Sequence, residues 1–300
     1  MANPIKTLPS QWQVNKLLPR PVDYEYFKDW QRFKFEPDKK DHSAINAWWL
    51  ADCSLFAYED KTKVESTLLS VSEFEKEGKL KWQWLNEGSS QGFMVEADDF
   101  FIVSLRGTEF YPIEKILRYP WLVLSVLRDF RADVRLTLKT HNTDPVMRYK
   151  VADGFYHEFQ NTWKQVEKFI GTSSDKPIWL TGHSLGAAIN TLVAFQLDEP
   201  HRTKLYTYGS PCVGGDDFAT EFKRRKLDTN TYRYVHGNDI VVKALPYSRK
   251  IFGSPRFQHV GKLRTRARNP FSFSLWINLN IFDHSPIYYT LQTWNMIPDE

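Results

Sequence analysis

One serine, flanked by glycines two residues away on each side, constrains this chain more than any other feature. It is Ser184, within Gly-His-Ser-Leu-Gly-Ala-Ala at residues 182–188. An apolar run at 177–181 precedes it, and a helix-forming segment follows through Leu197. The pattern predicts a sharp strand-to-helix turn, where glycines are needed because the chains pack too closely for side chains. A serine at such a turn projects its hydroxyl beyond the sheet, next to the first N–H groups of the helix.

Strand-like and helix-like segments alternate along the rest of the chain. Periodicity predicts strands at 79–85, 92–96, 100–105, 134–138, 177–181, 205–208, 232–235 and 257–263. It predicts helices after Ser43 through Ala57, at 64–71, 154–170, 185–197 and 216–226, and from Pro286 onward. We therefore expect an α/β fold, with a mainly parallel mixed sheet covered by helices on both faces. The expected organisation is an irregular N-terminal arm at 1–40 and a single domain at 41–300.

Composition is that of an ordinary globular enzyme. With 42% hydrophobic residues, 300 residues can bury one large core. The net charge of +4 is concentrated at 223–226 and in the arginine-rich segment 264–268, which we interpret as solvated faces. No nucleic-acid-binding motif accompanies them, so nucleic acid is not an expected partner. Cys53 and Cys212 lie far apart in apolar segments, which favours free core thiols over a disulfide.

The N-terminal segment lacks the apolar stretch of a secretory signal peptide. No apolar run approaches the roughly eighteen residues needed to span a membrane. The expectation is a chain without a transmembrane segment, cytoplasmic by default, with leaderless export left open.

A serine hydroxyl becomes a nucleophile when a histidine takes its proton and a carboxylate orients that histidine. In α/β-hydrolases the order along the chain is serine, acid, histidine. Asp239 fits the acid, because it follows the apolar strand 232–235 in a Gly-Asn turn. The alternative for Asp239 is an aspartate that only caps its turn.

Eight histidines compete for the role of base. Six precede Asp239, the last of them, His236, by only three residues, which leaves His259 and His284. His259 falls within the strand-like stretch 257–263, where alternation puts it on the face of Phe257 and Leu263 and so against the sheet. His284 lies in a polar break before the helix at Pro286, and a loop between rigid elements suits a proton shuttle. His284 is therefore the predicted base.

The oxyanion of the tetrahedral intermediate requires two N–H donors. The N–H of Leu185, directly after the nucleophile, supplies one. Thr108 is the predicted second donor, because it follows the strand 100–105 and a glycine that permits close approach. The alternative for this segment is a strand-ending turn without function.

The segment 109–128 bears on the substrate. Six of its apolar residues form one helical face: Ile113, Ile116, Leu117, Trp121, Leu124 and Leu127. Other sides are apolar too, and Pro120 should break the segment in two. One interpretation is a buried helix pair. The other is a lid that covers the site in water and opens onto lipid.

Together these motifs resemble the class 3 lipases, the fungal-type triacylglycerol lipase family of α/β-hydrolases. The matching residues are Arg-Gly-Thr at 106–108, Asp-Phe-Arg-Ala-Asp at 129–133, Gly-Phe at 154–155, Thr-Gly-His-Ser-Leu-Gly-Ala-Ala at 181–188, Tyr-Gly-Ser-Pro-Cys-Val-Gly at 208–214, Gly-Asn-Asp-Ile-Val at 237–241 and Asp-His at 283–284. The resemblance implies the same nucleophile, acid, base and oxyanion donors, and adds that Asp133 holds the Thr108 hydroxyl. The chain departs from the family pattern in two places. Ala152 stands where the family often has histidine, and the stretch between Thr108 and Asp129 is longer than the family leads us to expect.

The resulting expectation is a carboxylic ester hydrolase that acts on acyl lipids through an acyl-serine intermediate. It would work at a lipid–water interface and without metal or cofactor. A triacylglycerol lipase comes first, followed by a phospholipase A1 or an esterase of soluble esters. A catalytically silent hydrolase fold used for binding stays open, as does an acyltransferase or thioesterase that uses the same triad.

Overall fold

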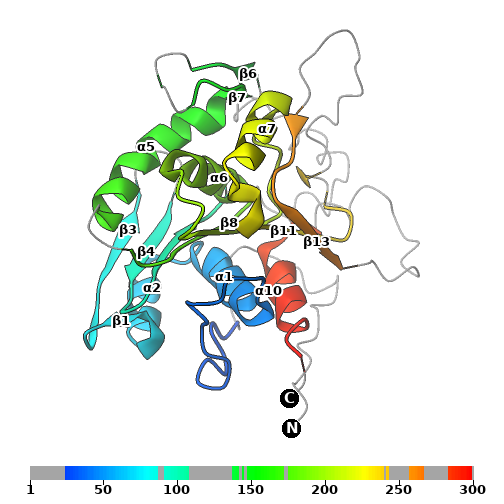
Figure 1. The fold of residues 1–300 in the computed structure, drawn as a ribbon. Helices are drawn as coiled ribbons and strands as arrows, with labels where there is room; N and C mark the ends of the chain where they lie inside the picture. Colours follow the sequence, from blue (N-terminus) through cyan, green and yellow to red (C-terminus); the bar gives the residue numbers. More distant parts are fainter. Residues whose placement is uncertain are drawn as a thin grey trace.

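The computed structural model describes residues 24–86, 91–107, 137–141, 144, 147–171, 175–239, 241–242, 257–266 and 283–298. Its helices are α1 (Ala44–Phe56), α2 (Lys61–Leu68), α5 (Asp153–Ile170), α6 (Leu185–Leu197), α7 (Asp216–Arg224) and α10 (Pro286–Trp294), with short 3₁₀ turns η2 (Ser72–Phe74) and η3 (Leu227–Asn230). These elements surround a central sheet (Figure 1).

The central sheet has seven strands in the order β13 (Lys262–Arg266), β11 (Thr231–His236), β9 (Thr203–Tyr208), β8 (Ile178–His183), β5 (Phe101–Leu105), β4 (Gly92–Glu96) and β3 (Trp82–Leu85). Strands β13 to β5 pair in parallel, whereas β5–β4 and β4–β3 pair antiparallel. The predicted mainly parallel, mixed α/β sheet is therefore confirmed. Its parallel strands end at one edge, which is where open α/β sheets place their sites.

Both faces of this sheet are covered, as expected. Helices α5, α6 and α7 lie on one face, and α1 and α10 lie on the other (Figure 1). Successive strand residues alternate between the two cores: Leu180 packs with the α5–α6 side, and its neighbour Trp179 with the α1–α10 side. Strands buried on both faces read as continuous apolar runs, which explains why 177–181 carried no alternation.

Two smaller sheets accompany the central one. One has four strands in the order β12 (Phe257–Gln258), β10 (Gly214–Gly215), β7 (Val151–Ala152) and β6 (Leu138–Lys139). The other is a two-stranded ribbon of β1 (Glu75–Lys76) and β2 (Lys79–Leu80).

The predicted strand 257–263 is wrong, because the structure divides it between two sheets. Strand β12 ends at Gln258, and β13 begins at Lys262 in the central sheet. Gly261 between them has a φ of +81°, a backbone conformation that breaks a strand and favours glycine. Leu263 is consequently exposed, whereas Phe257 is buried, so the two do not share a buried face with His259.

Residues 24–40 contain turns and irregular segments but neither helix nor strand. They pack on the α1–α10 side, where Phe27, Phe33 and Phe35 are buried. The fully buried carboxylate of Asp52 on α1 accepts the Phe27 N–H at 2.8 Å and the Tyr24 hydroxyl at 2.6 Å. This part of the predicted arm is thus fixed to the body by a buried polar anchor as well as by apolar contacts.

Two expectations about the chain as a whole concern cysteines and membranes. Cys53 and Cys212 are both free and buried, as predicted. Within the residues that the structure describes, no helix combines the length and apolar character needed to cross a membrane.

Candidate active site

Ser184 lies between the end of β8 and the first residue of α6. Its φ of 56° and ψ of −121° are strained for a residue with a side chain, and such strained residues are concentrated at functional sites. Its N–H donates to the Tyr208 carbonyl at 3.0 Å, which ties the turn to the neighbouring strand β9. The predicted strand–turn–helix at this serine is therefore present.

The glycines around Ser184 are explained by the approach of β5. A Cβ on Gly182 would lie 2.7 Å from the Leu105 carbonyl oxygen, and one on Gly186 would overlap that same oxygen. Since van der Waals contact requires more room, only glycine fits at either position. Helix α6 can then start directly against the end of β5.

Ser184, His284 and Asp239 are brought together from three separate segments. His284 Nε2 lies 2.9 Å from Ser184 Oγ, and its Nδ1 lies 2.7 Å from Asp239 Oδ2. A carboxylate can only accept, so the proton sits on Nδ1 and Nε2 accepts from the serine hydroxyl. This is the hydrogen-bond order that nucleophilic catalysis by serine requires.

Asp239 follows β11 and is completely buried. Its Oδ1 accepts the N–H groups of Val241 at 2.9 Å and Val242 at 3.3 Å. Its Oδ2 accepts from His284 and also from the Tyr289 hydroxyl at 2.5 Å. The carboxylate therefore caps its turn and orients the histidine at the same time, so the two interpretations of Asp239 are compatible.

His284 precedes α10 and is 2% exposed. The carboxylate of Asp283 accepts the Asn238 N–H at 2.7 Å, which ties the loop of the histidine to that of Asp239. Gly209, with a φ of +61°, lies beneath the pair, where a Cβ would come within 3.0 Å of His284 Nδ1. The imidazole is thus held from several sides.

The predicted oxyanion donors are only partly within the described residues. Leu185 is the first residue of α6, so its N–H has no partner within the helix and lies beside Ser184. Thr108, Asp133 and the segment 109–128, with its proposed lid residues, lie outside the described residues. Gly107, directly before Thr108, is described: a Cβ there would be 2.7 Å from Ser184 Cβ, so this loop begins against the nucleophile.

Sequence reasoning missed two tyrosines at this site, Tyr289 on the acid and Tyr58 beneath the serine. The Tyr58 hydroxyl lies 2.8 Å from Nδ1 of His183, whose Nε2 lies 2.7 Å from the His284 carbonyl oxygen. Burial, and then the nearby His284, lower the pKa of His183 well below its usual value, so this ring is neutral. In the sequence, a tyrosine that packs in a core and one that supports a site look alike.

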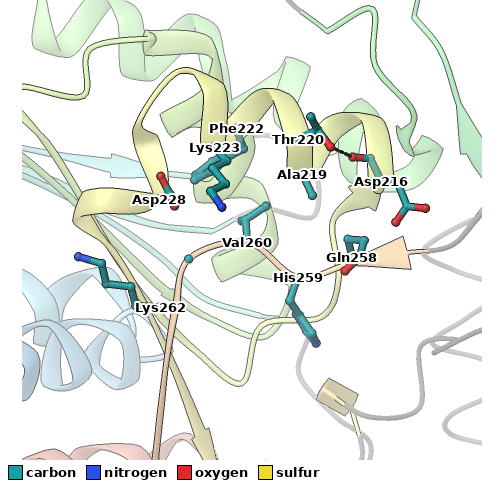
Figure 2. A pocket seen from close by; sticks show the side chains of 11 residues that line it. Asp216, Ala219, Thr220, Phe222, Lys223, Asp228, Gln258, His259, Val260 and Lys262 are labelled. Atoms are coloured by element: carbon teal, nitrogen blue, oxygen red, sulfur yellow. Dashed lines mark hydrogen bonds between the residues drawn. The ribbon is translucent and has the colours of Figure 1, made fainter.

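His259, the rejected candidate for the base, lines a different place. It borders a pocket of about 590 Å³ between α7 and the β12–β13 segment, together with Lys223 and Val260 (Figure 2). The described residues lining this pocket include no member of the Ser184–His284–Asp239 set. Burial, and then the positive charge of Arg233, lower the pKa of His259 to about 4.

A metal centre has no support in the part of the chain described. No group of three or more histidine, cysteine, aspartate or glutamate side chains gathers there in a metal-binding arrangement.

Comparisons with known proteins point to one family. A family model described as "Lipase (class 3)" matches residues 124–248, a range that contains Ser184 and Asp239. The chain is 33% identical over 131 residues to a secreted mono- and diacylglycerol lipase of Malassezia restricta, an alignment that covers 41% of this chain and 43% of that protein. It is 24% identical over 177 residues to the toxin TseL of Vibrio cholerae, covering 51% of this chain and 27% of the toxin. The chain thus spans less than half the length of these curated relatives.

Among solved structures, a propeptide complex of Rhizomucor miehei lipase resembles this fold. The TM-score is 0.52 at 18% sequence identity, with 82% of this chain and 75% of that chain covered. At this identity the likeness concerns the fold, and it agrees with an α/β-hydrolase arrangement.

Proposed function

We propose that this chain, whose residues 124–248 match the class 3 lipase model, belongs to that family and is a serine-dependent carboxylic ester hydrolase acting on acyl lipids. The observation that carries the proposal is the Ser184–His284–Asp239 arrangement at the edge where the parallel strands end, with 2.9 Å and 2.7 Å between successive partners. No second function is favoured by a specific observation.

In the acylation step, His284 Nε2 takes the proton of Ser184 as Oγ attacks the ester carbonyl carbon. The carbonyl π bond opens and its electrons go to the oxyanion, which the N–H groups of Leu185 and Thr108 would stabilise. When the tetrahedral intermediate collapses, His284 returns the proton to the departing alcohol. The acyl group then remains on Ser184 as an ester.

Deacylation repeats these steps with water in place of Ser184 as the nucleophile. His284 removes a proton from water, the hydroxide attacks the acyl carbon, and Ser184 leaves with the proton that His284 holds. Asp239 stays ionised and stabilises the imidazolium formed in both steps, and the buried hydrogen bonds to its two oxygens keep it in place. Every proton taken is returned, so the cycle needs neither metal nor redox cofactor.

Acylglycerols are the proposed substrate class. The support is the family and the name of the Malassezia relative, a mono- and diacylglycerol lipase. Triacylglycerols lead in our proposal, and partial acylglycerols are the first alternative. The apolar segment 109–128 beside Thr108 would serve as the lid at a lipid–water interface.

Ser184→Ala tests the proposal directly. Hydrolysis of a short p-nitrophenyl ester should fall by at least about 10⁴-fold, because the nucleophile is lost. Ser54→Ala is the matched control: its hydroxyl is also buried but donates to the Ala51 carbonyl, and activity should stay within about threefold. Wild-type activity in the Ser184→Ala variant would refute the assignment.

A substrate panel tests the class. Mono-, di- and triacylglycerols, phospholipids and short soluble esters should each be measured below and above their solubility limits. We expect acylglycerols to be preferred and the rate to rise sharply once an emulsion forms. A smooth saturation curve across that boundary would remove the lid proposal and leave the ester hydrolase intact.

A further inference from the structure

A buried chain of hydrogen bonds runs beneath Ser184 and joins two loops of the site. At one end, the Gly107 N–H donates to the Tyr58 hydroxyl oxygen at 2.9 Å. That oxygen lies 2.8 Å from His183 Nδ1, and His183 Nε2 lies 2.7 Å from the His284 carbonyl oxygen. Both Tyr58 and His183 are 1% exposed.

The direction of each hydrogen bond in this chain is determined. The His284 carbonyl can only accept, so His183 Nε2 must carry a proton. The His183 ring is neutral because burial, and then His284, lower its pKa well below the usual value, so Nδ1 is an acceptor. Tyr58 therefore donates its hydroxyl proton to Nδ1 and accepts the Gly107 N–H on its oxygen.

The two ends of this hydrogen-bond chain are the loop of the proposed oxyanion donor and the backbone of the proposed base, which must act on the reaction at Ser184 together. Gly107 precedes the proposed oxyanion donor Thr108 and packs against the serine, where a Cβ would lie 2.7 Å from Ser184 Cβ. The His284 backbone carries the ring whose Nε2 lies 2.9 Å from Ser184 Oγ. Tyr58 follows α1, so these hydrogen bonds join the end of α1 to segments that are distant from it in the sequence.

We propose that Tyr58 and His183 form a positioning relay that holds the oxyanion loop and the base in register around Ser184. The proposal rests on the serine hydrolase function proposed above. The relay requires no contact between either residue and the substrate. Their effect is geometric, since misplacement of a reacting group by about 1 Å can cost about 10²-fold in rate.

Tyr58→Phe removes one oxygen atom and interrupts the relay in the middle. Using a short soluble p-nitrophenyl ester, we expect kcat to fall about 10- to 100-fold with KM changed less than about threefold. Reaction with a fluorophosphonate should slow by a similar factor. Tyr206→Phe is the matched control, because it also removes a buried hydroxyl that accepts a backbone N–H, from Ser43 at 3.3 Å. It should lower thermal stability while kcat stays within about threefold.

His183→Gln provides a second interruption of the same link. The amide nitrogen of a glutamine can keep a donor toward the His284 carbonyl, but no glutamine atom then occupies the position of the histidine Nδ1, so Tyr58 loses its acceptor there. Both substitutions break the same link. The kcat of the double variant Tyr58→Phe/His183→Gln should therefore be no lower than that of the less active single variant. If Tyr58→Phe does not fold, His183→Gln with its kcat and KM decides alone.

The outcomes separate the relay from the function. Wild-type kcat in a folded Tyr58→Phe or His183→Gln, multiplicative losses in the double variant, or equal losses in Tyr206→Phe would each overturn the relay while the hydrolase proposal stands. A wild-type protein that neither hydrolyses esters nor reacts with the fluorophosphonate would instead overturn the function on which the relay rests.

Discussion

Replacing Asp239 by asparagine tests the proposed acid, because the surrounding hydrogen bonds fix how the new amide must sit. The Oδ1 position receives two backbone N–H groups, from Val241 and Val242, and so must hold the amide oxygen. The amide NH₂ then occupies the Oδ2 position, 2.7 Å from His284 Nδ1. An N–H donor there forces the histidine proton onto Nε2, where it blocks proton transfer from Ser184.

The size of the effect follows from this wrong tautomer. The same acid-to-amide change in a serine protease lowers kcat about 10⁴-fold. Since each factor of ten corresponds to about 1.4 kcal/mol, the expected loss of transition-state stabilisation here is about 5–6 kcal/mol. The fold should survive, because the amide keeps the shape of the carboxylate and the two backbone hydrogen bonds at Oδ1.

The assay is kcat for a short soluble p-nitrophenyl ester, with thermal unfolding measured alongside. The matched control is Asp153→Asn, which neutralises another buried aspartate, one paired with Lys139 at 2.8 Å at the start of α5. Its kcat should stay within about threefold. A folded Asp239→Asn variant with more than a tenth of the wild-type kcat would refute the tautomer reasoning.

Three further predictions concern the oxyanion loop and stability. Gly107→Ala should lower kcat at least about 10²-fold in the same ester assay, because its Cβ would lie 2.7 Å from Ser184 Cβ, and near-normal kcat would contradict this packing. Burial raises the pKa of Glu96, but Lys76, Lys81 and Lys176 lower it to about 2 overall, so its stabilisation is complete above about pH 4.5 and is lost as pH falls toward 2. Glu96→Gln should therefore cost about 1–3 kcal/mol in urea unfolding at pH 7 and flatten the acid limb, and an unchanged acid limb would contradict it. Burial, and then Arg233, lower the pKa of His259 to about 4, so between about pH 6.5 and 4 only the unfolded chain binds a proton at this histidine. As the pH is lowered through this range, the free energy of unfolding should fall by up to about 1.4 kcal/mol per pH unit. His259→Gln should reduce that slope in urea unfolding, and an equal slope would contradict the shift.

The parts of the fold that could be predicted from sequence have strong local signals. Helix α6 begins and ends where the small and apolar residues after Ser184 indicate, and α10 begins at Pro286, a residue preferred in the first turn of a helix. Asp239 and His284 could be selected because Asp239 follows a strand and His284 precedes a helix, each within a polar turn. Their contact itself was an inference from chain order, and it appears in the structure as a distance of 2.7 Å.

The parts that could not be predicted depend on residues distant in sequence. The segment 257–263 alternates like one strand, yet Gly261 divides it and its two halves pair in different sheets. Nothing in the sequence distinguishes Tyr58 and Tyr289 from core residues, because burial of the ring is the same whether the hydroxyl supports a site or only packs. Only the tertiary structure shows that these hydroxyls meet His183 and Asp239.

The most direct test of the central claim is covalent labelling of the proposed nucleophile. The wild-type protein should be treated with a fluorophosphonate, weighed intact by mass spectrometry, digested and mapped. We predict one phosphonyl group per chain, on Ser184, with loss of ester hydrolysis in step with labelling and no adduct in Ser184→Ala. An unlabelled Ser184 in a protein that still hydrolyses esters, or an adduct on another residue that accounts for the inhibition, would contradict the claim.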